Sequence, residues 1–487
     1  MSEDSKSKVE IEKNRKFFTS FKKGNFEEEK KRTLNLSIKE GSAAAFMTGS
    51  GESYITPYAL ALNASNSQIG LLTSLSGLFG PISQIFGSKS MYKYSRRKLI
   101  TTAVFLQATM WLIILGLGIL YFNGIITNSA VPLLIFLYSL YAIVGAFGGP
   151  AWFSLMGDLV PEEKRGKYFS KRNKITGAVS MIVMLAAAFI LDFTKEKNLV
   201  IFGFAIVFGI ACIGRYVSAY LLSKHYYPRV EIKKKKYFSF IQFIKKAPSN
   251  NFGKFVIFVG LITLATNFAG PFFAVYMLKD LGYSYTWFTI INLSSALFTI
   301  LSMSLWGKIG DRYGNRKLLK IGSIFVPLAP LPWLISGNLI FLIFTAQFIS
   351  GVGWGAFNFA ASNFIYDSVS RHRRGICVAY YNIINGFGVF VGAVLGGLFA
   401  QYVHISFMNI FLLIFLISAI ARAIIVLILL PKIKEVRNIE HVSDKDVLRN
   451  LLIDIHPPFY GILRIVLFTM INFTKKINEK KKGFYFS

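Results

Sequence analysis

The chain has 487 residues, of which 53% are hydrophobic and only 16% are Asp, Glu, Lys or Arg. Soluble domains carry about 25% charged residues, so this composition excludes an ordinary soluble protein and indicates a membrane protein. The net charge of +31 does not indicate nucleic-acid binding, because Lys and Arg concentrate in the tails and in alternate short loops. Two distant cysteines, Cys212 and Cys377, exclude a disulfide framework or a cysteine-based zinc site.

Residues 1–38 are polar, with Lys-rich and Glu-rich blocks. They lack the apolar core and cleavage site of a signal peptide. We therefore predict a cytoplasmic tail, which is either partly helical near residues 25–32 or disordered throughout.

Twelve apolar runs follow, each close to the roughly 20 residues that a helix needs to cross a bilayer. They predict an all-α membrane protein with twelve transmembrane helices in two pseudo-symmetric six-helix bundles. The bundles are expected at 39–222 and 254–431, with a basic linker at 223–253 and a tail at 432–487. The predicted spans are 41–62, 68–87, 98–121, 131–157, 174–193, 199–222, 254–278, 285–306, 317–336, 339–366, 376–401 and 408–430.

The distribution of basic residues sets the expected orientation. Nineteen Lys and Arg residues fall in four short loops on one side, whereas the six loops of the other side carry only Lys195, Lys197 and Lys279. Basic loops face the cytoplasm. We therefore expect both termini and the linker in the cytoplasm and the protein in the cell (plasma) membrane.

The two halves repeat one another. The segments 158–166 and 367–375 share the spacing of an Asp, an Arg and a Gly, at an offset of 209 residues. An offset of 219 aligns Arg97-Lys98 with Arg316-Lys317 earlier in the halves. One duplicated six-helix unit explains both alignments. In each copy the Asp is expected to end one helix and the Arg-Gly pair to open the next.

The loop between the eighth and ninth spans reads Gly-x-x-x-Asp-Arg-x-Gly-x-Arg-Lys from Gly307 to Lys317. This spacing resembles the loop signature of the major facilitator superfamily. The resemblance implies a secondary transporter that works by alternating access of two six-helix halves, without ATP. The first half departs from the signature, because Tyr92 stands where Asp311 stands and Ser95 where Gly314 stands.

These loops predict a conformational gate. We expect Asp311 to cap the start of the fifth helix, near residues 174–177, when the cytoplasmic side is closed. Arg312 and Arg316 would pair with Asp367 or with nearby backbone. Simple helix capping and loop solvation are the alternative. The candidate gate residues are Gly307, Asp311, Arg312, Gly314, Arg316, Asp158, Arg165, Gly166, Asp367, Arg374 and Gly375.

Glu52 lies eleven residues into the first predicted span, about 16 Å along a helix and thus near the bilayer midplane. A carboxyl group there is costly unless it faces water, a partner or a proton. We expect Thr48, Glu52 and Thr56 on one helix face, and the 219 offset maps Thr48 onto Asn267. Glu52 is therefore a candidate for proton coupling or substrate binding, with a structural pair to a buried Arg as the alternative.

Further candidates come from the family resemblance, which implies that the first, fourth, seventh and tenth helices line the cavity. Each aromatic among them is more often a packing residue, whereas a buried amide needs a partner. The candidates are Tyr54, Tyr58, Trp152, Trp354, Asn358 and Asn363. Arg215 and Arg422 occupy matching positions at an offset of 207. We expect them to reach the headgroups, with gating or anion attraction as the alternative.

Two basic segments are expected to touch the membrane surface. Lys233–Lys236 precede an aromatic run that predicts either an interfacial helix on anionic lipid or a solvated charge run. Residues 456–474 also predict an interfacial helix, because they are short for a span and are followed by the lysines Lys475 and Lys476.

No nucleotide-binding loop, metal cluster or nucleophile elbow is present in the sequence, so we expect no enzyme and no cofactor beyond a proton or another coupling ion. The expected partners are the lipid bilayer, anionic lipid and a small-molecule substrate, without nucleic acid, for a monomer. The predicted function is secondary transport of a small solute, proton-coupled and favouring export of amphiphilic or cationic compounds. The alternatives are a proton-coupled symporter for a sugar or metabolite, and a non-transporting receptor or scaffold.

Overall fold

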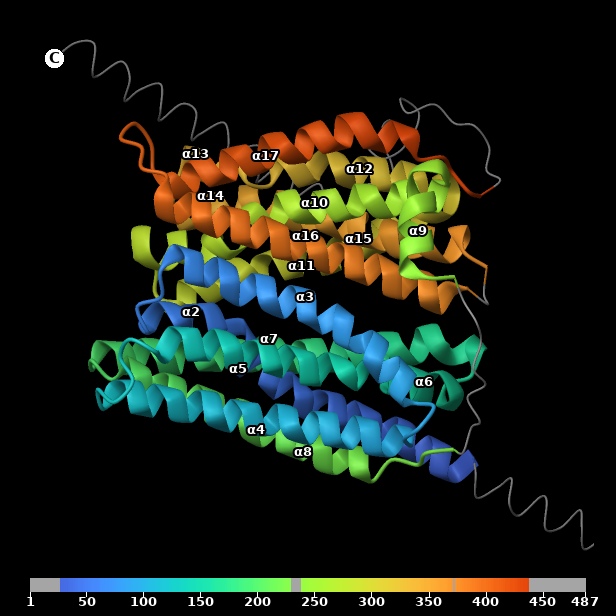
Figure 1. Cartoon of the computed structure of the whole chain (residues 1–487), viewed down its shortest axis with the longest axis horizontal. Helices are drawn as coiled ribbons and strands as arrows, with labels where there is room; N and C mark the ends of the chain where they lie inside the picture. The colour runs from blue at the N-terminus through green and yellow to red at the C-terminus, as the bar shows by residue number, and fades with distance from the viewer. Residues whose placement is uncertain (1–26, 229–237, 371–372, 438–487) are drawn as a thin grey trace, which may run out of the picture.

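The structure is a computed structural model that describes residues 27–228, 238–370 and 373–437. The described part of the chain folds into long helices joined by short loops (Figure 1). The predicted interfacial helix at 456–474, the lysines of 233–236 and most of the two tails lie outside the described residues.

The N-terminal half contains six spanning helices. The first, residues 27–61, changes type along its length, and its last three segments are η1 Met47–Gly51, η2 Glu52–Tyr54 and α2 Ile55–Ala61. The others are α3 Asn66–Ser90, α4 Arg96–Phe122, α5 Ala130–Phe147 with α6 Gly149–Leu159, α7 Arg165–Glu196 after η3 Glu162–Lys164, and α8 Val200–Ser223.

The C-terminal half repeats this plan after the linker helices α9 Phe240–Lys246 and η4 Ala247–Ser249. Its six spans are α10 Asn251–Val275 with η5 Tyr276–Asp280, α11 Tyr285–Tyr313, α12 Asn315–Leu328 with α13 Leu331–Ile335, α14 Leu339–Leu342 with η6 Ile343–Gln347 and α15 Phe348–Ser368, α16 Arg374–Tyr402, and α17 Ile410–Leu429 with η7 Leu430–Lys432.

The predicted twelve-helix bundle is confirmed. Eleven described helices are long and apolar enough to cross a membrane, and the twelfth is the first helix, which carries Glu52. The first helix begins at residue 27, which agrees with the helical alternative for residues 25–32 and extends the helix through the end of the expected tail at residue 38. Thr33 and Ser37, which the sequence assigned to the tail, are buried among the other helices, as is Glu40 of the expected bundle.

The described part of the linker packs against the C-terminal half. Phe243 of α9 is 5% exposed, and its ring contacts those of Tyr380 and Phe252. The Tyr380 hydroxyl donates to the carbonyl of Phe238. Residues 238–246 are therefore anchored on the C-terminal half, while Ile241 and Ile244 remain exposed on the same short helix.

Both described ends of the chain lie at one end of the bundle, to the right in Figure 1. We call this the tail end, and it also carries the loops 91–95 and 160–164 and residues 369–370 after α15. The opposite end, which carries the loops 62–65, 123–129 and 403–409, is called the loop end.

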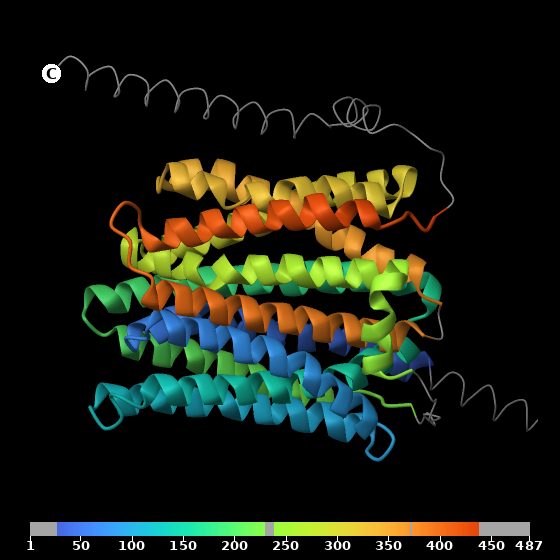
Figure 2. The same cartoon turned by 45° about the horizontal axis from the view of Figure 1, so that its top comes forward.

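The two halves meet along α3 and α16, which lie side by side in both views (Figures 1 and 2). Glycines allow this close approach. A Cβ atom at Gly70 would lie 2.4 Å from the carbonyl oxygen of Ala393, and one at Gly386 would lie 2.9 Å from that of Gly77. A second inter-half contact joins α7 and α11.

The buried apolar side chains divide into three clusters that differ between the two ends. One cluster combines residues of both halves, such as Tyr54 with Phe272 and Leu62 with Met277. At the tail end the clusters separate. One draws its buried residues from 243–433 and the other from 99–222. The halves therefore share a core near the loop end, whereas the buried residues of each tail-end cluster come from one half and only the partly buried Ile85 of the first half packs against the second-half cluster among the described residues.

Candidate functional site

Glu52 lies where the first helix is irregular. A π-helical segment, Met47–Gly51, is followed by a single 3₁₀ turn, Glu52–Tyr54. Pro57 explains the break, because it has no N–H to donate to the carbonyl of Ser53 and its ring crowds that carbonyl. The expected single face of Thr48, Glu52 and Thr56 assumed a regular helix, and it stays a prediction because the helix changes type between these residues.

The carboxylate of Glu52 is half-buried and accepts a hydrogen bond of 2.6 Å from the hydroxyl of Tyr141. Tyr141 is 2% exposed and packs edge-on against Trp111 and flat against Tyr138. The partner of Glu52 is therefore a tyrosine in an aromatic cluster, and not the buried arginine of the structural alternative.

The tyrosines that were expected near a central cavity are core residues. Tyr54 is fully buried. Its hydroxyl donates to the carbonyl of Met184 and shares a 2.7 Å hydrogen bond with Thr289 of the other half. Tyr58 is 1% exposed and donates to the carbonyl of Ile114. Tyr54 thus connects the halves, and Tyr58 stabilises one of them.

The remaining expected binding residues are spread over the bundle. Asn267 is half-buried and donates to the carbonyl of Thr263. Trp152 lies at the tail end, with the guanidinium of Arg172 4.9 Å from its ring. Three further residues are partly or fully accessible, namely Thr48, Thr56 and Asn363. Asn358 is exposed, and Trp354 lines a cavity in the C-terminal half.

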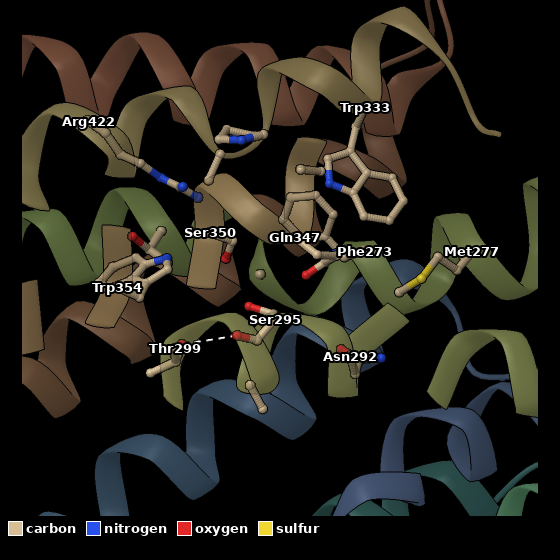
Figure 3. A pocket seen from close by; sticks show the side chains of 16 residues that line it. Phe273, Met277, Asn292, Ser295, Thr299, Trp333, Gln347, Ser350, Trp354 and Arg422 are labelled. Atoms are coloured by element: carbon tan, nitrogen blue, oxygen red, sulfur yellow. Dashed lines mark hydrogen bonds between the residues drawn. The ribbon is translucent and has the colours of Figure 1, made fainter. Parts of the chain in front are cut away.

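That cavity has a volume of about 470 Å³ and is lined by residues of 266–277, 292–299, 329–354 and 422. Aromatic walls come from Phe273, Trp333 and Trp354. Polar groups come from Thr266, Asn292, Ser295, Gln347 and Ser350. Figure 3 shows Arg422 entering from one side, with its guanidinium directed toward Ser350 and Trp354.

The two intramembrane arginines do not reach the headgroups, so that expectation was wrong. Arg215 donates through Nε, at 2.8 Å, and through Nη2 to the side-chain oxygen of buried Gln107. Its Nη1 donates to Ser218. Arg422 is 2% exposed and donates through Nη1 to the carbonyl of Val326. Both arginines point into their own half.

Arg215 belongs to a polar network that the sequence did not reveal. Ser218 donates to one carboxylate oxygen of Glu40 at 2.8 Å, and Arg172 donates to the other oxygen at 3.2 Å. Glu40 is 4% exposed. Glu40 lies just before the first predicted span, so hydropathy alone did not single it out as a buried residue of the bundle.

The repeated Asp and Arg-Gly segments have matching geometry in the two halves. Asp158 ends α6 and Asp367 ends α15, while Arg165 and Arg374 open the next helices. Arg165 donates to the carbonyl of residue 157, and Arg374 donates to that of residue 366. Each arginine thus bonds the carbonyl eight residues earlier, as the predicted duplication requires. Gly166 and Gly375 have open space beside them.

The partners of the two aspartates also correspond. Arg96 donates to Asp158 at 2.5 Å, and Asn315, its counterpart at the 219 offset, donates to Asp367 at 2.5 Å. Asp367 also accepts from Arg437 at 2.8 Å. The charge that Arg96 supplies in the first half is therefore supplied by the segment after α17 in the second.

The signature loop is not closed against the first half here. Asp311 is 86% exposed in its side chain and lies 4.0 Å from Arg437. Gly314 has φ +86, a conformation that favours glycine. Arg316 donates to the carbonyl of Ile433, whereas the guanidinium of Arg312 lies over the ring of Tyr313. Gly307 has open space beside it.

A contact at the loop end was missed by sequence reasoning. Asp192, near the end of α7, accepts hydrogen bonds from the backbone N–H groups of Tyr285 at 2.7 Å and Thr286 at 2.8 Å. These groups form the N-terminus of α11, where the helix dipole favours an anion. The contact joins the two halves, and Asn66 adds another by donating to the carbonyl of Ala400.

The family model described as Major Facilitator Superfamily matches the chain twice, over residues 41–264 and 255–484. The chain belongs to the major facilitator superfamily. The two matches correspond to the two halves, and the described helices agree with a family of membrane transporters. This superfamily member is therefore a multi-pass membrane protein.

Two solved transporters share the fold of this superfamily member. The nucleoside transporter NupG superposes with a TM-score of 0.61 at 16% identity, covering 82% of this chain and 99% of that one. A bacterial homologue of the iron transporter ferroportin in an inward-facing state also gives 0.61, at 14% identity, covering 82% and 98%. These identities support similarity of fold alone.

Sequence similarity to curated proteins is local. The vacuolar basic amino acid transporter 1 of Saccharomyces cerevisiae is 35% identical over 98 residues, which are 20% of this chain and 17% of that protein. The superfamily member thus spans about a sixth of the length of such relatives.

Proposed function

We propose that this transporter carries a small solute across its membrane by alternating access, and that the described conformation is open at the tail end. The division of the buried core carries this proposal. Near the loop end one apolar cluster joins the halves, whereas at the tail end each half has its own cluster. Asp192 and Tyr54 add inter-half hydrogen bonds on the closed side.

The tail end faces the cytoplasm in this proposal, and the protein resides in the cell membrane. The basic loops support that orientation, because Lys and Arg are retained on the cytoplasmic side. The described state is then inward-open, with both termini in the cytoplasm. Rocking of the two halves about α3, α16, α7 and α11 would open the loop end.

We further propose that Glu52 carries the coupling proton. It is half-buried in the least regular part of the first helix, and its carboxylate has the Tyr141 hydroxyl as partner. A tyrosine hydroxyl can donate to the ionised acid and accept from the protonated one. An acid held by an arginine would lack that freedom.

The aromatic cavity fits an amphiphilic solute, as the sequence suggested. Arg422 lines the same cavity and argues against a cationic one, because like charges repel. We assign neither import nor export on these grounds. A receptor without turnover remains the competing function for the same fold.

Counterflow in proteoliposomes tests transport against that alternative. A thermal-shift screen of sugars, amino acids, organic acids and lipophilic cations first supplies a ligand, since a ligand at about 100 times its dissociation constant stabilises by about 2.7 kcal/mol. We expect exchange of labelled ligand for unlabelled ligand inside the vesicles. Binding without exchange would support the receptor and overturn the proposal.

The conformational part is tested with two pairs of spin labels. Lys167 and Lys308 are exposed at the tail end, and Lys197 and Lys279 are exposed at the loop end. Each pair joins the two halves. We expect ligand or a change of pH to shorten the tail-end distance while lengthening the loop-end distance. Changes of both pairs in the same direction would contradict alternating access.

A further inference from the structure

We propose that the cavity in the C-terminal half is a binding site for a small organic carboxylate, held by the guanidinium of Arg422. The inference rests on the proposed transport function only in taking this anion as the solute. It starts from an unpaired cation inside the membrane-spanning bundle, which is costly unless a counter-charge is present.

The hydrogen bonds of Arg422 leave one edge of its guanidinium free. Nη1 donates to the carbonyl of Val326 at 3.0 Å. That carbonyl is available because Pro330, four residues later, has no N–H to donate. Nε is buried without a hydrogen-bond partner among the described residues, and no described group bonds Nη2. Nε and Nη2 form one planar edge, which matches the two oxygens of a carboxylate.

The described residues that line the cavity supply Arg422 with no counter-charge. Among the described residues that line the cavity, none is Asp or Glu. The hydroxyl of Thr266, on the cavity wall, is also buried without a partner among the described residues. Figure 3 shows the guanidinium directed into the cavity. A single cation and a free hydroxyl in one cavity indicate a ligand that carries one negative charge.

Comparison of the two halves explains why this edge is free. Arg215 is the counterpart of Arg422, and its guanidinium is occupied by Gln107. At the 219 offset, the counterpart of Gln107 is Val326, which has no polar side chain. The second half therefore keeps the arginine and lacks its side-chain partner.

The same comparison explains why the cavity exists. In the first half Trp111 and Tyr141 pack together as buried aromatics, with Tyr138 stacked beside them. The 219 offset makes Pro330 the counterpart of Trp111 in the second half. The 209 offset makes Ser350 the counterpart of Tyr141 and Gln347 the counterpart of Tyr138. All three counterparts line the cavity. Smaller and more polar residues thus leave space where the first half has a packed aromatic core.

The cavity favours a carboxylate with an apolar body. A carboxylate balances one guanidinium, whereas a phosphate dianion would leave a charge uncompensated. Trp333, Trp354 and Phe273 provide flat apolar walls for the rest of the ligand. Ser350 and Gln347 can bond further oxygens.

Benzoate, phenylacetate and hexanoate are suitable probes, with benzamide as the uncharged and benzylamine as the cationic control. Binding is followed on the purified full chain by calorimetry and by intrinsic tryptophan fluorescence, to which the two cavity tryptophans contribute along with the other four. We expect at least one carboxylate to bind and both controls to bind about tenfold more weakly or not at all. Preferential binding of benzylamine, or no binding by any carboxylate, would overturn the assignment.

Two variants test the role of Arg422 by different routes. Arg422→Gln removes the charge, and Val326→Gln offers Arg422 the amide partner that Arg215 has. We expect each to weaken carboxylate binding at least about tenfold. Val326→Leu is the matched control and should retain binding. Thermal melts show whether each variant folds, and equal affinity in Val326→Gln, Val326→Leu and wild type would contradict the proposal.

The outcome is separable from that of the transport proposal. Carboxylate binding without counterflow would leave the site standing and remove the transport function. Counterflow of a neutral or cationic solute without carboxylate binding would support the transport function and overturn the carboxylate site.

Discussion

Glu52 and Tyr141 form a carboxyl–phenol pair at the irregular part of the first helix. If this pair carries the coupling proton, Glu52→Gln should still exchange solute, because the amide keeps the shape and can bond Tyr141. The variant should lose net accumulation driven by a pH gradient, because an amide does not titrate in this range. Comparing counterflow with gradient-driven uptake in proteoliposomes checks this expectation.

Ser53→Ala is the matched control for that experiment, since Ser53 lies in the same 3₁₀ turn as Glu52, donates to the carbonyl of Thr48 and carries no titratable group. It should leave both activities unchanged. Glu52→Gln with wild-type pH dependence would remove Glu52 from the coupling step.

His225 predicts an acid-sensitive contact just after α8. Burial, and secondarily Arg172, lowers its pKa to about 4 from an ordinary value of 6.5, and both ring nitrogens lack partners among the described residues. The folded state thus requires neutral His225. Protonation of His225 therefore does not reduce the free energy of unfolding above pH 6.5. As the pH falls toward 4 this free energy decreases, by about 2 kcal/mol at pH 5. His225→Gln should remove this part of the acid destabilisation in thermal melts, and an unchanged pH profile would refute the role of His225.

At the scale of elements, close packing of α10 and α16 depends on glycines. A Cβ atom at Gly392 would lie 2.2 Å from the carbonyl oxygen of Leu264, so Gly392→Ala must separate the helices. We expect a loss of roughly 1–3 kcal/mol from overpacking. Gly116→Ala is the control, because that helical glycine has no neighbour within 4 Å and alanine favours helix. Thermal melts in detergent compare the two, and equal stability would refute the packing argument.

The helices were predictable because a bilayer leaves the backbone few alternatives to helices of about 20 apolar residues. The irregular segment of the first helix was only partly predictable. Pro57 indicated a break, but the π and 3₁₀ turns at residues 47–54 also depend on packing against other helices. Hydropathy therefore placed Glu52 within a spanning helix, but the regular helical periodicity assumed for its neighbours does not apply to this segment.

The cavity and the two arginines were beyond sequence reasoning for another reason. Hydropathy reports polarity and not side-chain volume. The smaller size of Pro330 compared with its first-half counterpart Trp111 therefore did not indicate a cavity in the sequence. Position along a helix also does not show which way a side chain points. Arg215 and Arg422 were near enough to the headgroups to reach them, but Gln107 and the carbonyl of Val326 hold them inside.

At the scale of the whole molecule, α7 and α11 run in opposite directions and each ends in an acid. Asp192 near the end of α7 caps the start of α11 at the closed loop end. Asp311 near the end of α11 is 86% exposed at the tail end, on the side where α7 starts. The two acids are therefore placed to act as alternate latches, one for each state.

This arrangement predicts opposite effects of two equivalent substitutions. Asp192→Asn should weaken the loop-end closure, because an amide oxygen accepts from the backbone without the charge that the α11 dipole favours. A loss of about 1.4 kcal/mol shifts the population about tenfold toward the state open at the loop end. Asp311→Asn should destabilise that other state and so preserve the described one, and the double variant should lie between them. The Lys197–Lys279 spin-label pair reports the shift, and Asp280→Asn is the control because Asp280 bonds Asn409 within one half. If Asp192→Asn and Asp311→Asn moved the distance distribution in the same direction, the two acids could not be latches of opposite states.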